Sequence, residues 1–191
     1  MQRKNIEIKN DFEYYSELTY GEKSSEENPI LLEQKVTHKD WLSNKSNIEH
    51  INIEEKIDLT VERKKSFYKY GIKLTCKEFT KEPYFRFDSD GPAHRNKLKE
   101  IPLSEQKITT PHFNCFDKEG IAIAYKTDVL KNKGDSKAIV ENIEFGLSHF
   151  FQEANINQDD KNIIPVIELK VPKLFEDKIE TDPLNGVNFI N

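Results

Sequence analysis

The stretch HFNCFDKEGIAIAYK, residues 112–126, carries the clearest folding signal of this chain. Apolar and polar residues alternate on both sides of the turn sequence DKEG at residues 117–120. Two such runs around an acidic, glycine-containing turn are typical of a β-hairpin. Residues 72–76 and 85–88 alternate in the same way, and residues 51–59 carry isoleucine and leucine at even spacings. The middle of the chain is therefore predicted to form antiparallel strands.

A helical stripe follows this hairpin. Asp135 or Ser136 is a suitable N-cap, and the helix is expected to extend to about Ala154. Its apolar residues recur at helical spacing and would face the sheet: Ile139, Ile143, Leu147, Phe150 and Phe151. The predicted fold class is α+β, with an antiparallel sheet of about five or six strands packed by one long C-terminal helix.

The other segments carry weaker patterns. Ile6 and Ile8 alternate with polar residues, so residues 5–20 are predicted to form a short strand or an extended arm. Residues 38–47 are predicted to hold a short helix around Trp41. A final strand is expected among the isoleucine-rich and valine-rich residues 163–169.

The length of 191 residues fits one domain with its own core. We expect residues 1–49 to be an N-terminal extension packed on that core, and residues 50–172 to be the α+β core domain. Residues 173–191 contain a proline and a glycine and show little periodicity. They are expected to be a C-terminal tail that is surface-bound or partly disordered.

The composition excludes several classes of protein. The mean hydropathy is −0.76, and no run approaches the ~20 apolar residues of a membrane span. The basic start of the chain precedes no apolar region, so no secretory signal is expected. The two cysteines, Cys76 and Cys115, lie far apart in strand-like surroundings, which favours two buried thiols over a disulfide. These features predict a cytoplasmic protein with no membrane partner.

Charge is distributed unevenly along the chain. The net charge is −5, which opposes loose binding to nucleic acid. Residues 61–107 nevertheless carry 12 Lys/Arg and 7 Asp/Glu, whereas the segments on both sides are acidic. This basic region either binds an anionic partner or forms a solvated lysine face.

Polar residues gather between Phe85 and Asn114. If residues 85–88 and 112–116 form neighbouring strands, alternation places their phenylalanines on one face and their polar residues on the other. The connecting loop adds further polar groups near that second face. The candidate site comprises Arg86, Asp88, Asp90, His94, Arg95, Asn96, His112 and Asn114.

Two histidines and an arginine are the groups required for RNA cleavage without a metal. In this hypothesis His94 and His112 act as acid and base, because an imidazole exchanges protons near neutral pH. Arg86 stabilises the charged phosphorane and Asp88 orients an imidazole. Asp90 would then bind substrate together with Arg95, Asn96 and Asn114. The hypothesis requires neither a metal nor a cofactor.

Three alternatives remain open for the same residues. A divalent metal could be held by His94, His112, Asp88 and Asp90, although their spacing matches no known ligand signature. Pro92 also stands where a calcium loop would place its next oxygen ligand. The cluster could instead be a surface that recognises phosphate or an acidic partner. In the purely structural alternative, the Arg86–Asp88 pair and the Asp90 side chain hold a long loop in place.

Several spaced motifs also carry a family resemblance. The motifs FRFD at 85–88, GPAHRN at 91–96 and PHFN at 111–114, followed by an acid-glycine turn and Ala124-Tyr125, resemble an uncharacterised family of small bacterial proteins. The likeness extends over roughly residues 50 to 170 and includes the helix that ends FQEANI. More distantly, the pattern is similar to toxins of bacterial toxin–antitoxin pairs. That kinship implies a growth-inhibiting protein held by a partner.

The chain departs from the family pattern at one position. The family carries a His-x-His strand, and here the second histidine is Asn114. An asparagine is no general acid or base at neutral pH. If the family's catalysis uses that second histidine, this chain is either inactive or uses His94 instead. The resemblance adds a toxin-like or phage-defence-related role to the ribonuclease hypothesis that the histidines and Arg86 carry. The alternative is a non-enzymatic inhibitor or regulator, for example phage-encoded, that uses the 86–114 loop as an interface with a target or antitoxin.

Overall fold

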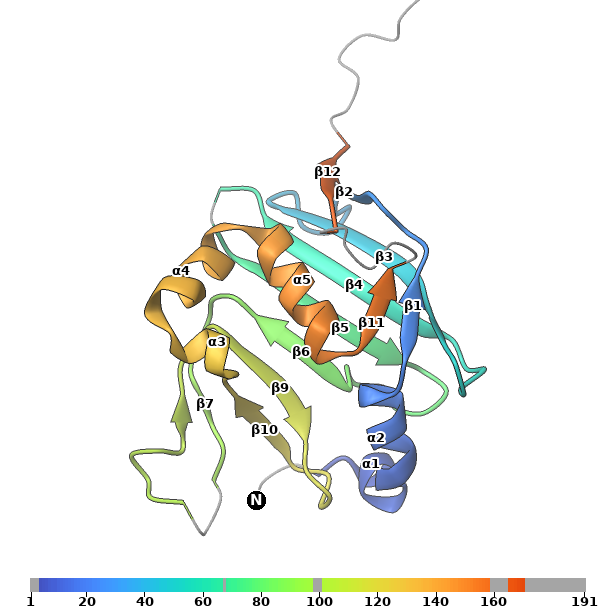
Figure 1. Ribbon diagram of the computed structural model, residues 1–191, viewed down its shortest axis with the longest axis vertical. Coiled ribbons are helices and arrows are strands. Elements are labelled where there is room, and N and C mark those ends of the chain that lie inside the picture. The colour runs from blue at the N-terminus through green and yellow to red at the C-terminus, as the bar shows by residue number, and fades with distance from the viewer. Residues whose placement is uncertain (1–3, 67, 98–100, 159–164, 171–191) are drawn as a thin grey trace, which may run out of the picture.

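The computed structural model describes residues 4–66, 68–97, 101–158 and 165–170. In these residues, one large sheet is combined with five short helices (Figure 1). The helices are α1 (Ile6–Asn10), α2 (Phe12–Tyr20), α3 (Asp128–Lys131), α4 (Lys133–Glu141) and α5 (Ile143–Glu153). The first strands are β1 (Lys23–Ser25), β2 (Ile30–Gln34), β3 (Trp41–His50), β4 (Ile57–Lys64), β5 (Tyr70–Cys76) and β6 (Phe85–Asp88). The remaining strands are β7 (His94–Arg95), β8 (Lys107–Ile108), β9 (His112–Phe116), β10 (Ala122–Tyr125), β11 (Ile156–Gln158) and β12 (Ile167–Leu169).

The fold class is α+β, as predicted, but the sheet is larger and mixed. Ten strands follow the order β10-β9-β6-β5-β4-β3-β1-β11, with β2 also paired to β3 and β12 paired to β2. The pairs β1–β11 and β2–β12 are parallel, so the prediction of five or six purely antiparallel strands was wrong. Three of these four strands have only three residues, too few for alternation to reveal them.

The centre of the sheet agrees with the sequence. β5, β6, β9 and β10 form at the predicted segments, and β9 and β10 pair as the expected hairpin. Its turn contains Gly120 at φ +70°, where a side chain would collide with the backbone of Asn5. Only glycine satisfies both conditions. The Asn5 N–H in turn donates to the Gly120 carbonyl at 2.8 Å and attaches the N-terminal segment to the hairpin.

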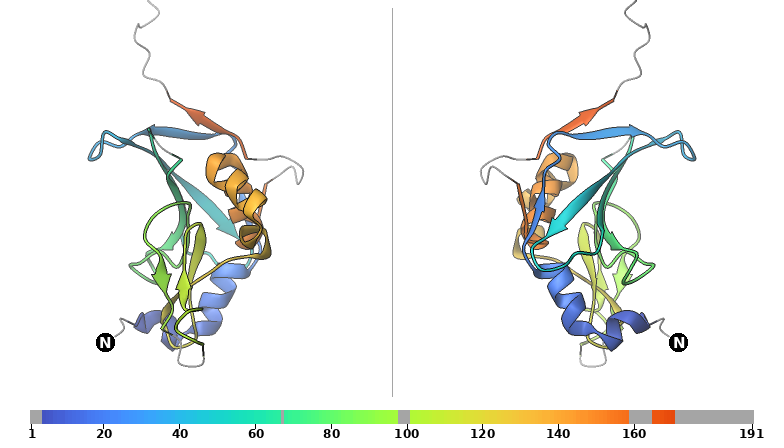
Figure 2. Two further views of the ribbon diagram at one scale, coloured as in Figure 1. Left: turned by 90° about the vertical axis from the view of Figure 1, so that its left-hand side faces the viewer. Right: turned by 90° about the vertical axis from the view of Figure 1, so that its right-hand side faces the viewer.

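The helical layer covers one face of the sheet (Figure 2). The predicted single long helix is instead two helices, because Asn142 interrupts it in an extended conformation (φ −125°, ψ 111°). The Asn142 side chain accepts a 2.8 Å hydrogen bond from the Glu144 N–H and caps α5. An asparagine offers the backbone this alternative to continued helix. The start also differs, since Asn132 rather than Asp135 or Ser136 caps α4.

Residues 6–10 and 12–20 form α1 and α2, so the predicted N-terminal strand or extended arm was wrong. Asn5 accepts a hydrogen bond from the Ile8 N–H, and Asp11 accepts one from the Tyr14 N–H. Both are N-caps. Ile6 is 55% exposed whereas Ile8 is fully buried. Two residues spaced by two would share one face of a strand, so their different exposure does not fit a strand and agrees with the helix α1.

The predicted short helix at residues 38–47 was also wrong, because β3 occupies residues 41–50 and pairs along β4. Ser46, Ile48 and His50 are buried in alternation. The predicted last strand is present as β12, while residues 163 and 164 and the tail from 173 lie outside the described residues. Within the described part of the chain, no helix is long and apolar enough to cross a membrane.

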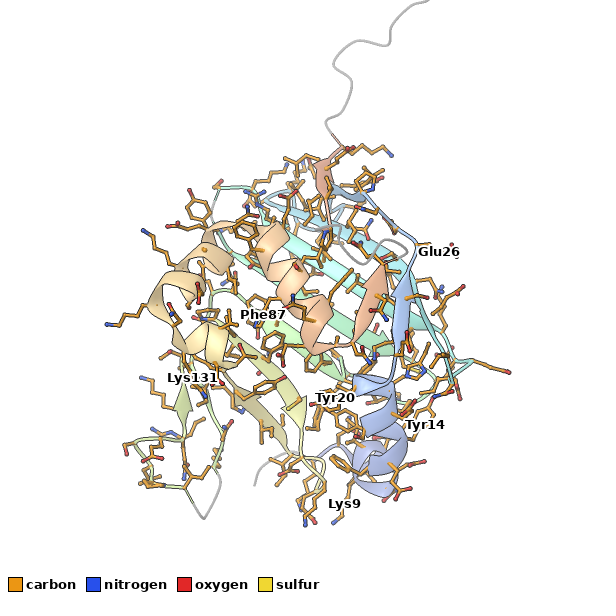
Figure 3. All side chains as sticks on the ribbon, in the orientation of Figure 1. Lys9, Tyr14, Tyr20, Glu26, Phe87 and Lys131 are labelled. Carbon is orange, nitrogen blue, oxygen red and sulfur yellow. The ribbon has the colours of Figure 1, made fainter. Side chains whose placement is uncertain are left out.

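Aromatic side chains fill the layer between the sheet and α5. Phe113 is fully buried, with its ring centroid 5.0 Å from that of Phe87 and 5.5 Å from that of Phe85. The Phe150 ring of α5 lies 6.2 Å from the Phe113 ring. Figure 3 labels Phe87 among these side chains. Cys76 and Cys115 are free and buried in this core, consistent with two thiols rather than a disulfide.

Candidate functional site

The β6–β9 pairing brings the predicted polar residues together. In its register Arg86 lies opposite Asn114, Phe87 opposite Phe113, and Asp88 opposite His112. The phenylalanines turn to the buried face against α5, and the four polar residues share the opposite face. The alternation predicted from the sequence is confirmed at this strand pair.

Asp88 is the centre of the cluster. Its Oδ2 atom lies 2.9 Å from Arg86 Nε and accepts a 2.8 Å hydrogen bond from Asn114 Nδ2. His112 Nε2 lies 3.7 Å from the same oxygen. Because Asp88 is 27% and Arg86 46% exposed, the guanidinium remains open to solvent while the carboxylate is partly enclosed. One carboxylate oxygen thus binds two neighbouring side chains and lies close to a third.

These residues line a hollow of about 330 Å³, here called the Asp88 hollow. It is at the small end of the ~300–1,000 Å³ typical of small-molecule sites. Six of the eight predicted residues line it: Arg86, Asp88, Asp90, His94, His112 and Asn114. The lining also includes Lys69, Thr110 and residues 91–93 of the loop. The hollow contains two imidazoles, two cationic side chains and two carboxylates.

His112 is the most enclosed of these groups, with a side chain only 3% exposed. Burial lowers the pKa of His112 below 6.5, and the Asp88 carboxylate opposes that shift. The positive fields of His94 and Arg86 add to the lowering of this pKa. Nδ1 completes no hydrogen bond with a described residue, although the Thr109 backbone lies close enough to favour the charged ring. The imidazole is therefore held mainly in its neutral, proton-accepting form at pH 7.

His94 reaches the hollow from β7, which pairs with β8 in a separate two-stranded sheet. Its Nε2 lies 3.3 Å from the Ala122 carbonyl oxygen, so this nitrogen carries a proton when the contact is a hydrogen bond. His94 is half-buried and thus more open to solvent than His112.

Two predicted residues lie outside the hollow. The Asn96 side chain donates to the Ala124 carbonyl at 2.8 Å and accepts from the Ala124 N–H at 2.7 Å. Because β10 is the last strand in the sheet order, Asn96 caps its free edge much as another strand would. Arg95 is exposed beside it and pairs by its backbone with Lys107. Asn96 therefore has a structural role that the sequence did not reveal.

Lys69 is a lining residue that the sequence did not single out. It lies directly before β5, and Gly71 of β5 pairs with Asp88. A lysine at the start of a strand is a common surface feature, so its position gave no distinct signal. The register of β5 against β6 brings it beside the acidic groups. In the described ranges, no group of three or more His, Cys, Asp or Glu side chains is placed to hold a metal ion, including the four residues considered for one.

Comparisons with protein-family models, curated proteins and solved structures give no match to this chain. The family resemblance and the toxin kinship therefore stay predictions.

Proposed function

We propose that the protein is a toxin-like or phage-defence-related ribonuclease that cleaves RNA in the Asp88 hollow without a metal. The observation that carries this proposal is the meeting of His94 and His112 with Arg86 and Lys69 around one hollow. Two imidazoles supply the acid and the base, and the two cations bind the phosphate. In this proposal the ribonuclease acts in the cytoplasm.

The neutral His112 would remove the proton from a ribose 2′-hydroxyl. The 2′-oxygen then attacks the adjacent phosphorus, and the resulting phosphorane is stabilised by Arg86 and Lys69. Protonated His94 gives its proton to the departing 5′-oxygen. The products are a 2′,3′-cyclic phosphate and a free 5′-hydroxyl, so every proton and bond is accounted for.

Asp88 and Asn114 act on this chemistry as positioning residues. Asp88 contacts Arg86 through Nε, which leaves the two terminal guanidinium nitrogens for a phosphate. Asn114 fixes the carboxylate by its 2.8 Å hydrogen bond. The asparagine thus performs an orienting task where the resembling family has a histidine.

The test is cleavage of a 5′-labelled single-stranded RNA in the presence of a metal chelator. We expect a cyclic-phosphate product, resistance of a substrate with 2′-deoxyribose at the cleaved position, and loss of at least 100-fold in rate for His112→Ala. His38→Ala, at an exposed histidine outside the hollow, is the matched control. Cleavage that persists in His112→Ala, or that no longer occurs with chelator, contradicts the proposal.

A second candidate is a non-enzymatic interface for a protein target or antitoxin. The observation that favours it is that the Asp88 carboxylate is already bound by Arg86 and Asn114, which leaves it less free to act on a substrate. The exposed Arg95 beside the hollow would then contact the partner. A stoichiometric partner recovered by the wild type and lost with Arg95→Glu supports this role, and a pulldown that Arg95→Glu leaves unchanged counts against it.

A further inference from the structure

A second hollow adjoins the Asp88 hollow. Its volume is about 590 Å³, and it is lined by Lys64, Tyr68, Lys69, Ser89, Asp90, Thr110, Pro111 and Val140. Lys69, Asp90 and Thr110 line both hollows. The two adjoining hollows are together called the groove, and its lining residues range from the imidazoles of His94 and His112 to Tyr68 in the β4–β5 turn.

Tyr68 is the large aromatic residue of this extension. It is 61% exposed, yet its backbone is fixed, because Ser89 Oγ donates to the Tyr68 carbonyl at 3.2 Å. The same Oγ accepts the Tyr70 N–H at 2.8 Å. A tyrosine side chain has only two rotatable bonds, so it loses little conformational entropy when a flat ligand stacks on its ring.

The groove extension is also locally basic. Lys64 and Lys69 line it against the single carboxylate of Asp90. Residues 61–73 carry five Lys/Arg and one acidic residue, in a chain whose net charge is −5. Aromatic rings interleaved with cations form the surface that binds single-stranded nucleic acid, because bases stack on the rings and phosphates meet the cations.

We infer that this groove binds single-stranded RNA, with the phosphate backbone along Lys69 and Lys64 and one base stacked on Tyr68. The inference rests on the proposed function, for it extends the same site to the nucleotides beside the cleaved bond. A duplex does not satisfy it, because paired bases stack on one another and leave no free face for the tyrosine. A peptide without negative charge would gain nothing from the basic character of the groove.

Binding is measured by fluorescence anisotropy with a labelled single-stranded RNA in which every ribose is 2′-O-methylated and therefore uncleavable. Tyr68→Ala is expected to weaken binding by roughly tenfold, whereas Tyr68→Phe retains the ring and stays within about twofold. Lys69→Ala is expected to reduce the salt dependence of log K by about 0.7. Lys118→Ala, in the exposed β9–β10 turn outside the groove, is the matched charge control and should change neither value.

The outcomes separate this inference from the proposed cleavage. Tyr68-dependent binding of the methylated strand upholds the groove even if natural RNA is not cut, a result that overturns only the catalytic role. Cleavage that requires His112 but binding that Tyr68→Ala leaves unchanged overturns only the groove. Equal affinity for a duplex, or a protein captured through Tyr68 in place of RNA, also overturns the groove. Thermal unfolding of each variant verifies that it is folded.

Discussion

Asn114 Nδ2 donates a 2.8 Å hydrogen bond to Asp88 Oδ2 across the β6–β9 pair. The same oxygen lies 2.9 Å from Arg86 Nε. Asn114 is therefore held in the cluster by a hydrogen bond and has a role of its own there, although it replaces the histidine of the resembling family. Because the Asn114 amide is neutral, it binds the Asp88 carboxylate without adding a second positive charge beside Arg86.

Replacement of Asn114 by aspartate is predicted to destabilise the protein more than replacement by alanine. Asn114→Ala loses one hydrogen bond to a carboxylate, worth about 1 kcal/mol at this partly exposed position. Asn114→Asp adds repulsion between two carboxylates. Urea unfolding at pH 7.5 and pH 4 measures both variants. The aspartate variant should recover stability relative to alanine at pH 4, and a deficit that is the same at both values contradicts the repulsion.

The stability of the fold is predicted to fall as the pH drops below 6.5, in part through His112. Burial lowers its pKa in the folded state, so the unfolded chain takes up the proton first. The contribution of His112 to the unfolding free energy is therefore fully present above about pH 6.5. It is lost as the pH falls from there to the lowered pKa of the folded state, by at most about 1.4 kcal/mol per pH unit for one site. Urea unfolding at pH 7.5 and pH 5.5 should show a smaller difference for His112→Gln than for wild type.

Two other histidines define the control for this pH experiment. Burial also lowers the pKa of His149, so some pH dependence remains in His112→Gln. His38 is exposed, and His38→Gln should keep the full wild-type difference. A His112→Gln variant with the wild-type pH dependence would show that this imidazole titrates alike in both states.

Gly146→Ala is predicted to cost about 2–3 kcal/mol. The added Cβ would collide with the Tyr70 hydroxyl, which donates a 2.5 Å hydrogen bond to the Ile139 carbonyl. The variant must displace the ring and weaken that buried bond. Gly134→Ala is the matched control, because its Cβ meets only Asn132 Oδ1 at 3.4 Å and alanine favours helix. Chemical denaturation should show loss at Gly146 and no loss at Gly134.

Asn96→Ala is predicted to lower the unfolding free energy by about 2 kcal/mol, because the buried N–H and C=O of Ala124 both lose their partner. Amide hydrogen exchange at Ala124 should accelerate in the same variant. Arg95→Ala, at the exposed neighbour, is the control and should leave both measurements near wild type. If Asn96→Ala weakens RNA binding without a change in stability, the residue belongs to the binding surface instead.

Local patterns were sufficient to predict the centre of the fold. The alternation of Phe85 and Phe87, and of Phe113 and Cys115, identified the inward face of β6 and β9, which placed Arg86 and its neighbours on the other face. These faces follow from a two-residue period, which a sequence displays directly. The pairing of the two strands was an assumption, and the register that sets Asp88 opposite His112 is known only from the structure.

Tertiary context decided the features that the sequence did not predict. The helix breaks at Asn142, where the side chain caps α5, although the helical apolar stripe of the sequence continues across this position. The groove residues Lys69 and Tyr68 come from a turn whose distance to the Asp88 hollow is set by strand pairing. Asn96 was predicted to bind substrate. Its structural role could not be predicted, because its hydrogen bonds to Ala124 join residues 28 positions apart in the sequence.

The parallel pairs β1–β11 and β2–β12 have a consequence for biosynthesis. Each joins an early strand to one made near the end of the described chain, so a nascent polypeptide emerging from the ribosome must hold β1 and β2 without these partners. The antiparallel strands from β3 to β10 can assemble meanwhile. Closure of these two pairs therefore waits for β11 and β12, and until then β1 and β2 each have an open strand edge that chaperones and proteases can reach.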